Sequence, residues 1–341
     1  MSSESLKQSK FKPAWWLKNA HLQTIFPSLF RKVSCHTEVW RERLTTPDND
    51  FIDIDYCGKG KQPIVILLHG LAGSSQSGYI KGLQQVLIER NFRSVALNFR
   101  GCSGESNNSA RCYHSGETED IDFLYRVLRE REPDTPISAV GFSLGGNALL
   151  KWLGEQGNNI SLFSAVAVSV PFVLNMCASK LDSGFSRVYR HNLIQELIEY
   201  MQIKHAHLKN SGNIEEADRI SRLGDLSEIK SFWQYDDRVV ARLHGFKGVD
   251  DYYEKSSSRQ FLGKIAIPTL LIQAQDDPFM TQDVIPQQNE MAASVCMEVT
   301  QGGGHVGFVT GSNPLKPDYW LEQRIPEFLR QHLIGKSFGS L

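Results

Sequence analysis

Residues 137–153 read ISAVGFSLGGNALLKWL, and this stretch decides the fold. The run ISAV predicts a short buried strand, and the apolar spacing from residue 144 onward predicts a helix. Between them, residues 141–145 fit the pattern G-x-S-x-G, which forms a sharp turn between strand and helix and exposes its serine hydroxyl. Small residues suit this turn because it leaves no room for larger side chains. The sequence therefore predicts Ser143 as a nucleophile.

Strands and helices alternate on both sides of this turn. The predicted strands cover residues 64–68, 95–99, 137–140, 165–170, 268–274 and 295–300. The predicted helices cover residues 79–90, 118–131, 144–153 and 319–333. This alternation is typical of α/β proteins in which helices cover both faces of a mostly parallel central sheet.

The alternation is interrupted once. Residues 172–262 carry mostly helical patterns and separate two predicted strands, which makes them too long for a plain loop. We expect a helical cap at 172–262 and a core made of 61–171 and 263–341. Residues 1–60 are expected to hold an N-terminal segment and the first strands, packed on this core.

A serine hydroxyl needs a base to become a good nucleophile, and an acid must orient that base. After a strand–serine–helix turn, the acid and then the base follow along the chain. His305 lies in the glycine-rich segment 302–307 and is the predicted base. Asp276 and Asp277 both follow the strand at 268–274, so either can be the acid. Asp277 is favoured because a residue before a proline is held extended.

The negative oxygen formed during acyl transfer needs two backbone N–H donors. The first is predicted to be Leu144, which follows the nucleophile at the start of a helix. The second is predicted to be Leu71, in the loop HGLAG that follows the first parallel strand. His69 in the same loop is interpreted as a residue that braces the turn, because His305 already fills the role of base.

Composition excludes several other classes of protein. Lys and Arg (37) balance Asp and Glu (38), so the chain lacks the basic excess of nucleic-acid-binding proteins. The six cysteines are scattered without a CxxC pair, which argues against a zinc site and is typical of a reducing compartment. Residues 114–120 are better interpreted as a helix start with a Ser or Thr cap and an acidic first turn than as a metal cluster.

The N-terminus is polar, with no apolar region typical of a signal peptide. The longest aliphatic run, residues 64–68, is far shorter than the roughly 20 residues that span a bilayer. We therefore expect a cytoplasmic protein whose contact with membranes is at most peripheral. The sequence does not predict the oligomeric state.

Several blocks together resemble the YheT-like hydrolases of bacteria, which are related to the eukaryotic abhydrolase-domain lipases and esterases. The blocks are NAHLQT (19–24), HGLAG (69–73), NFRGCSG (98–104), YHSGET (113–118), GFSLGGN (141–147), DDPF (276–279) and GGHVGF (303–308). The resemblance implies an α/β-hydrolase fold and a triad of Ser143, Asp277 and His305. It also implies ester hydrolysis, with acylglycerols, short-chain esters or phospholipids as substrate classes.

Two functional hypotheses follow. The first is a serine hydrolase that acts on a small-molecule ester or lipid and needs no metal or organic cofactor. A thioesterase, an amidase or an acyltransferase would use the same residues, and the choice among them depends on the predicted cap. The second is a non-catalytic binding protein that keeps the fold and its cavity, because fold alone does not fix function.

Overall fold

The computed structural model describes residues 6–31, 33 and 38–337. Its centre is a nine-stranded sheet with the strand order β1-β9-β8-β7-β6-β4-β5-β3-β2. The strands are β1 (Leu6–Gln8), β2 (Val39–Thr45), β3 (Phe51–Cys57), β4 (Ile64–Leu68), β5 (Arg93–Asn98), β6 (Ile137–Phe142), β7 (Ala165–Val168), β8 (Thr269–Ala274) and β9 (Val295–Thr300). Only the pairs β2–β3 and β3–β5 are antiparallel within this sheet. The predicted, mostly parallel sheet is confirmed.

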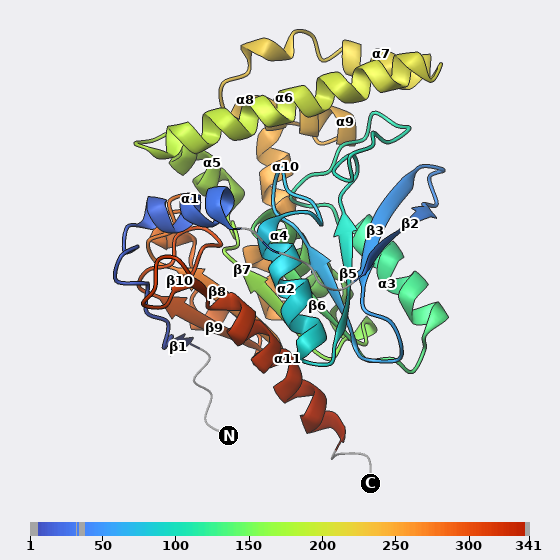
Figure 1. Cartoon of the computed structure of the whole chain (residues 1–341). Coiled ribbons are helices and arrows are strands. Elements are labelled where there is room, and N and C mark those ends of the chain that lie inside the picture. Colours follow the sequence, from blue (N-terminus) through green and yellow to red (C-terminus); the bar gives the residue numbers. More distant parts are fainter. Residues whose placement is uncertain (1–5, 32, 34–37, 338–341) are drawn as a thin grey trace.

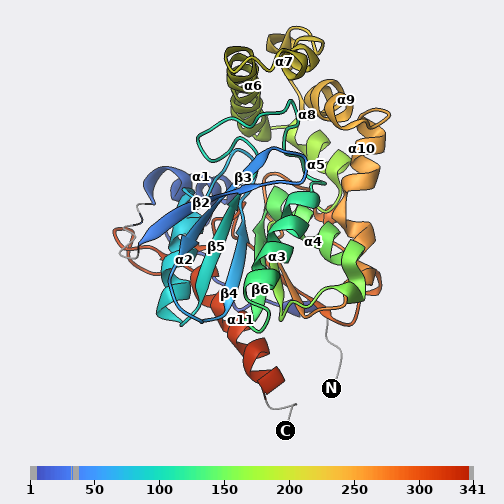
Figure 2. The same cartoon turned by 90° about the vertical axis from the view of Figure 1, so that its right-hand side faces the viewer.

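Helices cover both faces of the sheet, as Figure 2 shows. The helices of the core are α2 (Gly78–Glu89), α3 (Glu119–Arg131), α4 (Leu144–Gln156) and α11 (Leu321–Ser337). Side chains alternate along β4: Ile64, Ile66 and Leu68 join the apolar cluster that contains residues of α3 and α4. Val65 and Leu67 join the cluster that contains residues of α2 and α11. The strand is apolar throughout because both of its faces are buried.

Two details of the core differ from the sequence prediction. The strand expected at 165–170 ends at Val168, because Ser169 adopts a φ of 52° in the left-handed region, where a strand cannot continue. Helix α3 has the expected acidic first turn, but the hydroxyl of its N-cap residue, Thr118, makes no capping bond. That hydroxyl donates instead to Glu155 Oε2, and the Glu119 N–H donates to Glu117.

Between β7 and β8 the chain leaves the sheet and forms a helical insertion, whose helical elements run from Leu174 to Lys264. It contains α5 (Leu174–Leu181), α6 (Ser186–Asn210), α7 (Ile214–Ser221), α8 (Phe232–Tyr235), the π-helix η3 (Asp236–Ala241), α9 (Arg242–His244) and α10 (Val249–Ser256). The long helix α6 crosses the top of the molecule in Figure 1, above the sheet. Among the residues described, no helix is both long and apolar enough to cross a membrane.

A further helix, α1 (Ala20–Phe30), lies below the start of α6 in Figure 1. Parallel strands end at the same edge of a sheet, so the segments that follow β4, β6, β7, β8 and β9 meet there. Four of these segments contain the predicted site residues, which lie at positions 71, 143–144, 276–277 and 305.

Candidate active site

Ser143 occupies the turn between β6 and α4 with a φ of 50° and a ψ of −119°. A serine in this sparsely populated region is strained by on the order of 1–3 kcal/mol. The flanking glycines are required by close packing, because a Cβ on Gly141 would lie 2.5 Å from the Gly145 carbonyl oxygen. A Cβ on Gly145 would lie 2.4 Å from the His69 carbonyl oxygen. The turn therefore holds the serine side chain in one place at the sheet edge.

The structure brings three of the predicted residues into a chain of contacts. His305 Nε2 lies 2.9 Å from Ser143 Oγ, and His305 Nδ1 lies 2.8 Å from Asp277 Oδ2. The ring of Phe279 stacks on the imidazole, with 4.0 Å between centroids and 9° between planes. The Phe279 N–H donates to Asp277 Oδ1. An Nδ1–H donated to the carboxylate leaves the Nε2 lone pair free to accept the serine proton.

The two adjacent aspartates have different partners. Asp277 is buried and contacts the imidazole, whereas Asp276 Oδ1 accepts a hydrogen bond from the Gly304 N–H at 3.0 Å. Burial raises the pKa of the Asp276 carboxyl above its ordinary value. Asp276 therefore ties the loop after β8 to the loop that carries His305.

The loop after β4 presents the predicted oxyanion donor. The Gly70 N–H donates to the Tyr79 hydroxyl and the Ala72 N–H to the Tyr113 hydroxyl. Within the described residues, the Leu71 N–H between them has no protein acceptor. Leu144 is the first residue of α4, so its N–H has no acceptor within the helix. Both predicted donors are thus available to a ligand.

His69 braces this loop, as predicted. Its Nδ1–H donates to the Gly70 carbonyl oxygen at 2.7 Å, and its Nε2 accepts the Phe99 N–H at 3.1 Å. Burial lowers the pKa of His69 to about 4, which keeps the ring neutral.

Sequence reasoning missed three residues that hold the His305 loop. Thr24 Oγ1 on α1 accepts the His305 N–H at 2.9 Å, and Ser169 Oγ accepts the Val306 N–H at 3.0 Å. Gln23, also on α1 and fully buried, bonds both the N–H and the carbonyl oxygen of Val309. Gln23 and Thr24 belong to the block NAHLQT, but nothing in the sequence indicated that the block contacts residues nearly three hundred positions away.

A cavity of about 730 Å³ opens beside Ser143 and His305. Its wall is mostly apolar and is shared between the helical insertion, helix α1 and the loops of the core. Apolar lining residues include Leu174, Leu181, Leu193, Leu197, Phe232 and Val240. A cavity of this size and composition is typical of a small-molecule site.

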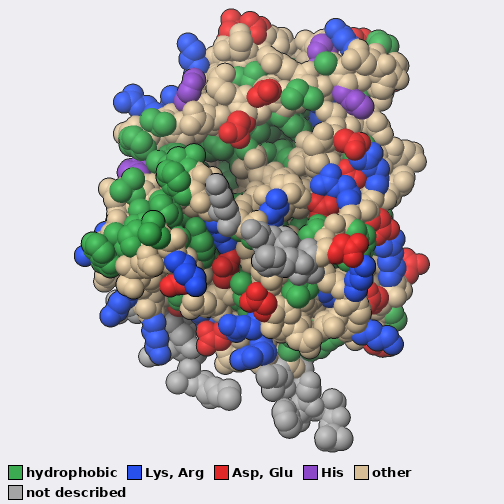
Figure 3. Space-filling view, viewed as in Figure 1, with side chains coloured by type: hydrophobic (Ala, Val, Ile, Leu, Met, Phe, Trp, Pro, Cys, Tyr) green, Lys and Arg blue, Asp and Glu red, His purple; other side chains and the backbone are tan. Residues whose placement is uncertain are grey.

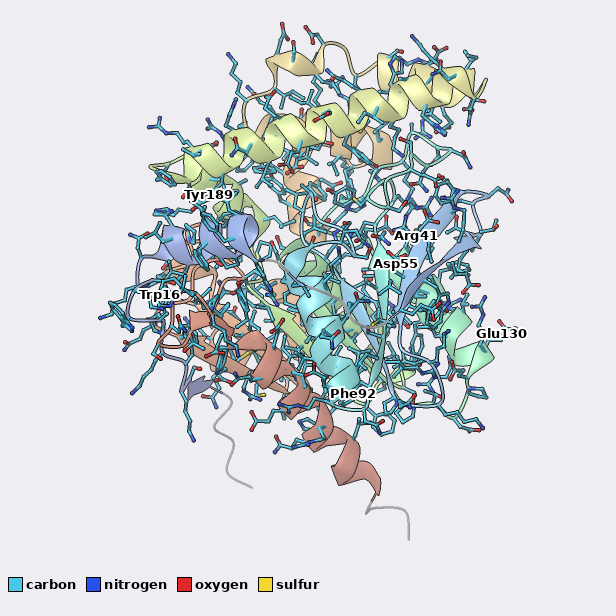
Figure 4. All side chains as sticks on the ribbon, viewed as in Figure 1. Trp16, Arg41, Asp55, Phe92, Glu130 and Tyr189 are labelled. Atoms are coloured by element: carbon cyan, nitrogen blue, oxygen red, sulfur yellow. The ribbon has the colours of Figure 1, made fainter. Side chains whose placement is uncertain are left out.

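Exposed apolar side chains lie along one side of the cavity mouth. Leu29 of α1 and Val188 of α6 are exposed and also line the cavity. Figure 3 shows apolar side chains gathered where α1 and the start of α6 lie, next to the hollow below α6. Tyr189 of α6 extends toward α1 (Figure 4), and its hydroxyl lies 3.1 Å from His21 Nδ1. The core and the insertion thus meet at the mouth.

The described part of the chain holds no group of three or more His, Cys, Asp or Glu side chains arranged to bind a metal ion. Residues 114–120, for which the sequence raised a metal alternative, lead into helix α3, which begins at Glu119. Here Glu117 pairs with Arg111 at 2.7 Å.

Comparisons with known proteins agree with this architecture. A family model described as "alpha/beta hydrolase fold" matches residues 63–312. "Putative esterase YheT" of Escherichia coli (strain K12) is 39% identical over 98% of this chain and 97% of that protein. "Phospholipase ABHD3" of Mus musculus is 29% identical over 82% of this chain and 68% of that protein. The expected resemblance to YheT is confirmed.

A solved structure, the esterase Pf2001 of Pyrococcus furiosus, has a similar fold. Its TM-score is 0.56 and its sequence identity 18%, over 88% of this chain and 96% of that one. At this identity the likeness concerns the fold alone.

Proposed function

This chain belongs to the α/β-hydrolase fold family, and we propose that it is a serine hydrolase that cleaves carboxylic esters at Ser143. The observation that carries the proposal is the chain of contacts from Ser143 Oγ through the His305 imidazole to Asp277 Oδ2. The names of the relatives, an esterase and a phospholipase, support the same class of reaction.

The first half of the reaction forms an acyl-enzyme. Ser143 Oγ attacks the ester carbonyl carbon while its proton passes to His305 Nε2. The carbonyl oxygen becomes negative and accepts hydrogen bonds from the N–H groups of Leu71 and Leu144. The tetrahedral species collapses, the carbon–oxygen bond to the alcohol breaks, and His305 returns the proton to the departing alkoxide. Asp277 stabilises the imidazolium that exists between these two transfers.

The second half releases the acid. A water molecule replaces the alcohol, gives its proton to His305 Nε2 and attacks the acyl carbon. The same two N–H groups stabilise the second oxyanion. Collapse frees the carboxylic acid and returns the proton to Ser143 Oγ. No step requires a metal or an organic cofactor.

The proposed substrate is a small-molecule ester or a lipid. The support is the apolar wall of the cavity, which suits an acyl chain. We further propose that residues 172–262 act as a cap that closes the cavity over Ser143 and selects the acyl group. A cytoplasmic location, expected from the sequence, stays a prediction.

The test is hydrolysis of p-nitrophenyl esters from acetate to palmitate by wild type and by Ser143→Ala, with covalent labelling of Ser143 by a fluorophosphonate. We expect the wild type to be labelled and active, and the variant to lose both properties. Hydrolysis retained by Ser143→Ala contradicts the proposal. A folded wild-type protein that is neither labelled nor active favours the alternative of a non-catalytic binder. Labelling without ester cleavage favours thioesterase, amidase or acyl-transfer chemistry at the same serine.

A further inference from the structure

One acidic side chain of the helical insertion faces the cavity and pairs with no cationic side chain among the described residues. Asp236, the first residue of the π-helix η3, lines the cavity together with its sequence neighbour Tyr235 and with Tyr253 of α10. The other carboxylate of the cavity wall, that of Glu196, is exposed to solvent.

The partners of Asp236 leave the carboxyl incompletely satisfied. Its Oδ2 accepts a hydrogen bond from the Tyr253 hydroxyl at 2.7 Å. No ion pair joins it to any Lys, Arg or His in the part of the chain that the structure describes. Burial raises the pKa of Asp236 to about 7, and the bond from Tyr253 opposes only part of this effect. Near neutral pH a substantial fraction of the carboxyl groups is therefore protonated and uncharged.

The local backbone is also unusual. π-Helical hydrogen bonding is rare and occurs frequently at functional sites. Here it begins at the residue that faces the cavity. Around it, Phe232, Tyr235, Val240 and Tyr252 present mostly aromatic and apolar surface. A polar pair in such a wall is expected to be matched by a polar group of a ligand, because buried polar groups are otherwise costly.

We propose that Asp236 and Tyr253 form a polar subsite that binds a hydroxyl group of the ester substrate, on a part of the substrate away from the scissile carbonyl. The inference rests on the proposed esterase function and narrows its substrates to esters that carry a free hydroxyl, recognised by these two side chains.

A hydroxyl fits this subsite better than an ammonium group. A hydroxyl both donates and accepts, as a carboxyl and a phenol together require. A cation would have to leave water for an apolar wall and would need the ionised form of Asp236, which burial disfavours. A purely apolar ligand would leave the pair without a partner.

The experiment compares two matched pairs of esters. A monoacylglycerol against the propyl ester of the same acid tests the alcohol part. An ω-hydroxyacyl p-nitrophenyl ester against its unsubstituted counterpart tests the acyl part. We expect wild type to prefer the hydroxylated member of one pair by roughly tenfold in kcat/KM, as one neutral hydrogen bond allows.

Three variants assign the preference to the subsite. Asp236→Leu removes every hydrogen bond of the carboxyl, leaves only the Tyr253 hydroxyl in the subsite and should lose most of the preference. Asp236→Asn keeps a donor and an acceptor and should retain most of the preference. Asp237→Asn is the matched control, because Asp237 is exposed, lies outside the cavity wall and accepts the Val249 N–H. If Asp236→Leu does not fold, Tyr253→Phe tests the same subsite and should lose part of the preference.

Several results would overturn the inference. The first is a wild type that shows no preference for the hydroxylated ester in either pair. The second is an unchanged preference in a folded Asp236→Leu enzyme. The third is a preference lost as completely in Asp236→Asn as in Asp236→Leu. That result would mean that the negative charge, and not hydrogen bonding, binds the ligand. The unsubstituted esters separate this test from the proposed function: their cleavage should still depend on Ser143 whether or not the subsite exists.

Discussion

Acidic side chains of the sheet core and of the helical insertion have different partners. In the core, Asp55 pairs with Arg41 at 2.7 Å (Figure 4). Asp120 pairs with Arg100, also at 2.7 Å. Burial alone would raise the pKa of Asp55, yet the bonds from Arg41 and its neighbours lower it. In the insertion, Asp236 has a phenol as its partner, and burial raises its pKa to about 7.

The difference indicates which acids serve the fold and which serve a ligand. An acid matched by a guanidinium is satisfied before any substrate arrives, so its role is structural. Asp277 and Asp236 differ from these acids because they contact a titratable imidazole and a phenol. Each of these two partners lines the cavity beside the proposed nucleophile.

The largest effect should come from the core acid with the imidazole partner. Asp277→Asn should lower kcat roughly 10⁴-fold, because an amide can hold the imidazole in the wrong tautomer. Asp276→Asn should lower it by less than about tenfold, because the amide oxygen still accepts the Gly304 N–H. Steady-state hydrolysis of a p-nitrophenyl ester measures both. Equal losses of kcat in the two variants would mean that Asp277 is not the acid that orients His305.

The next largest effect should follow from leaving a core acid without its arginine. Arg100→Met strands the buried carboxylate of Asp120 and should reduce the free energy of unfolding by about 3–5 kcal/mol. Urea denaturation gives the value. The control is Arg126→Met, whose exposed pair with Asp122 should contribute less than about 1 kcal/mol. A small effect of Arg100→Met would mean that the core acids do not depend on their arginines.

The pH dependence of stability should distinguish the acid of the insertion. Since the pKa of Asp236 is raised when folded, the folded state retains a proton that the unfolded chain loses above about pH 4. Wild type therefore loses stability relative to Asp236→Asn as the pH rises from about 4 to about 7. A change of about three pKa units corresponds to a difference on the order of 4 kcal/mol at pH 8, measured by urea denaturation across the range. Parallel curves for the two proteins would contradict a raised pKa.

The smallest effect should come from the bond that α1 makes to the His305 loop. Thr24→Val keeps the shape of the side chain but removes the acceptor of the His305 N–H. The cost of about 1 kcal/mol should appear as a loss of several-fold in kcat with little change in KM. Thr310→Val, which removes a hydroxyl bonded to the Lys12 carbonyl oxygen, is the control. A change confined to KM would assign Thr24 to substrate binding.

Much of the fold could be predicted because its signals are local. Strands β4, β6 and β8 are short, mostly apolar runs buried on both faces, so the periodic pattern located them within a few residues. The order of Ser143, the acid and His305 followed from the turn chemistry around them. A sequence also shows which residue precedes a proline, and the acid favoured on that ground, Asp277, is the one that contacts the imidazole.

What could not be predicted depends on contacts between distant segments. Strand β1 pairs in parallel with β9, and no pattern in three residues indicates a partner so far along the chain. Thr118 stands where a helix cap is expected, but the carboxylate of Glu155 in α4 takes its hydroxyl. The role of Asp236 depends on how α8, η3 and α10 pack around a cavity, which local periodicity does not encode.

The backbone at Ser143 has a consequence for related sequences. A φ of 50° and a ψ of −119° suit glycine better than serine, so Ser143→Gly should make the protein more stable while removing the nucleophile. Selection for stability and selection for chemistry therefore oppose each other at this one position. A lineage that stopped using the reaction is therefore expected to lose the serine at this position.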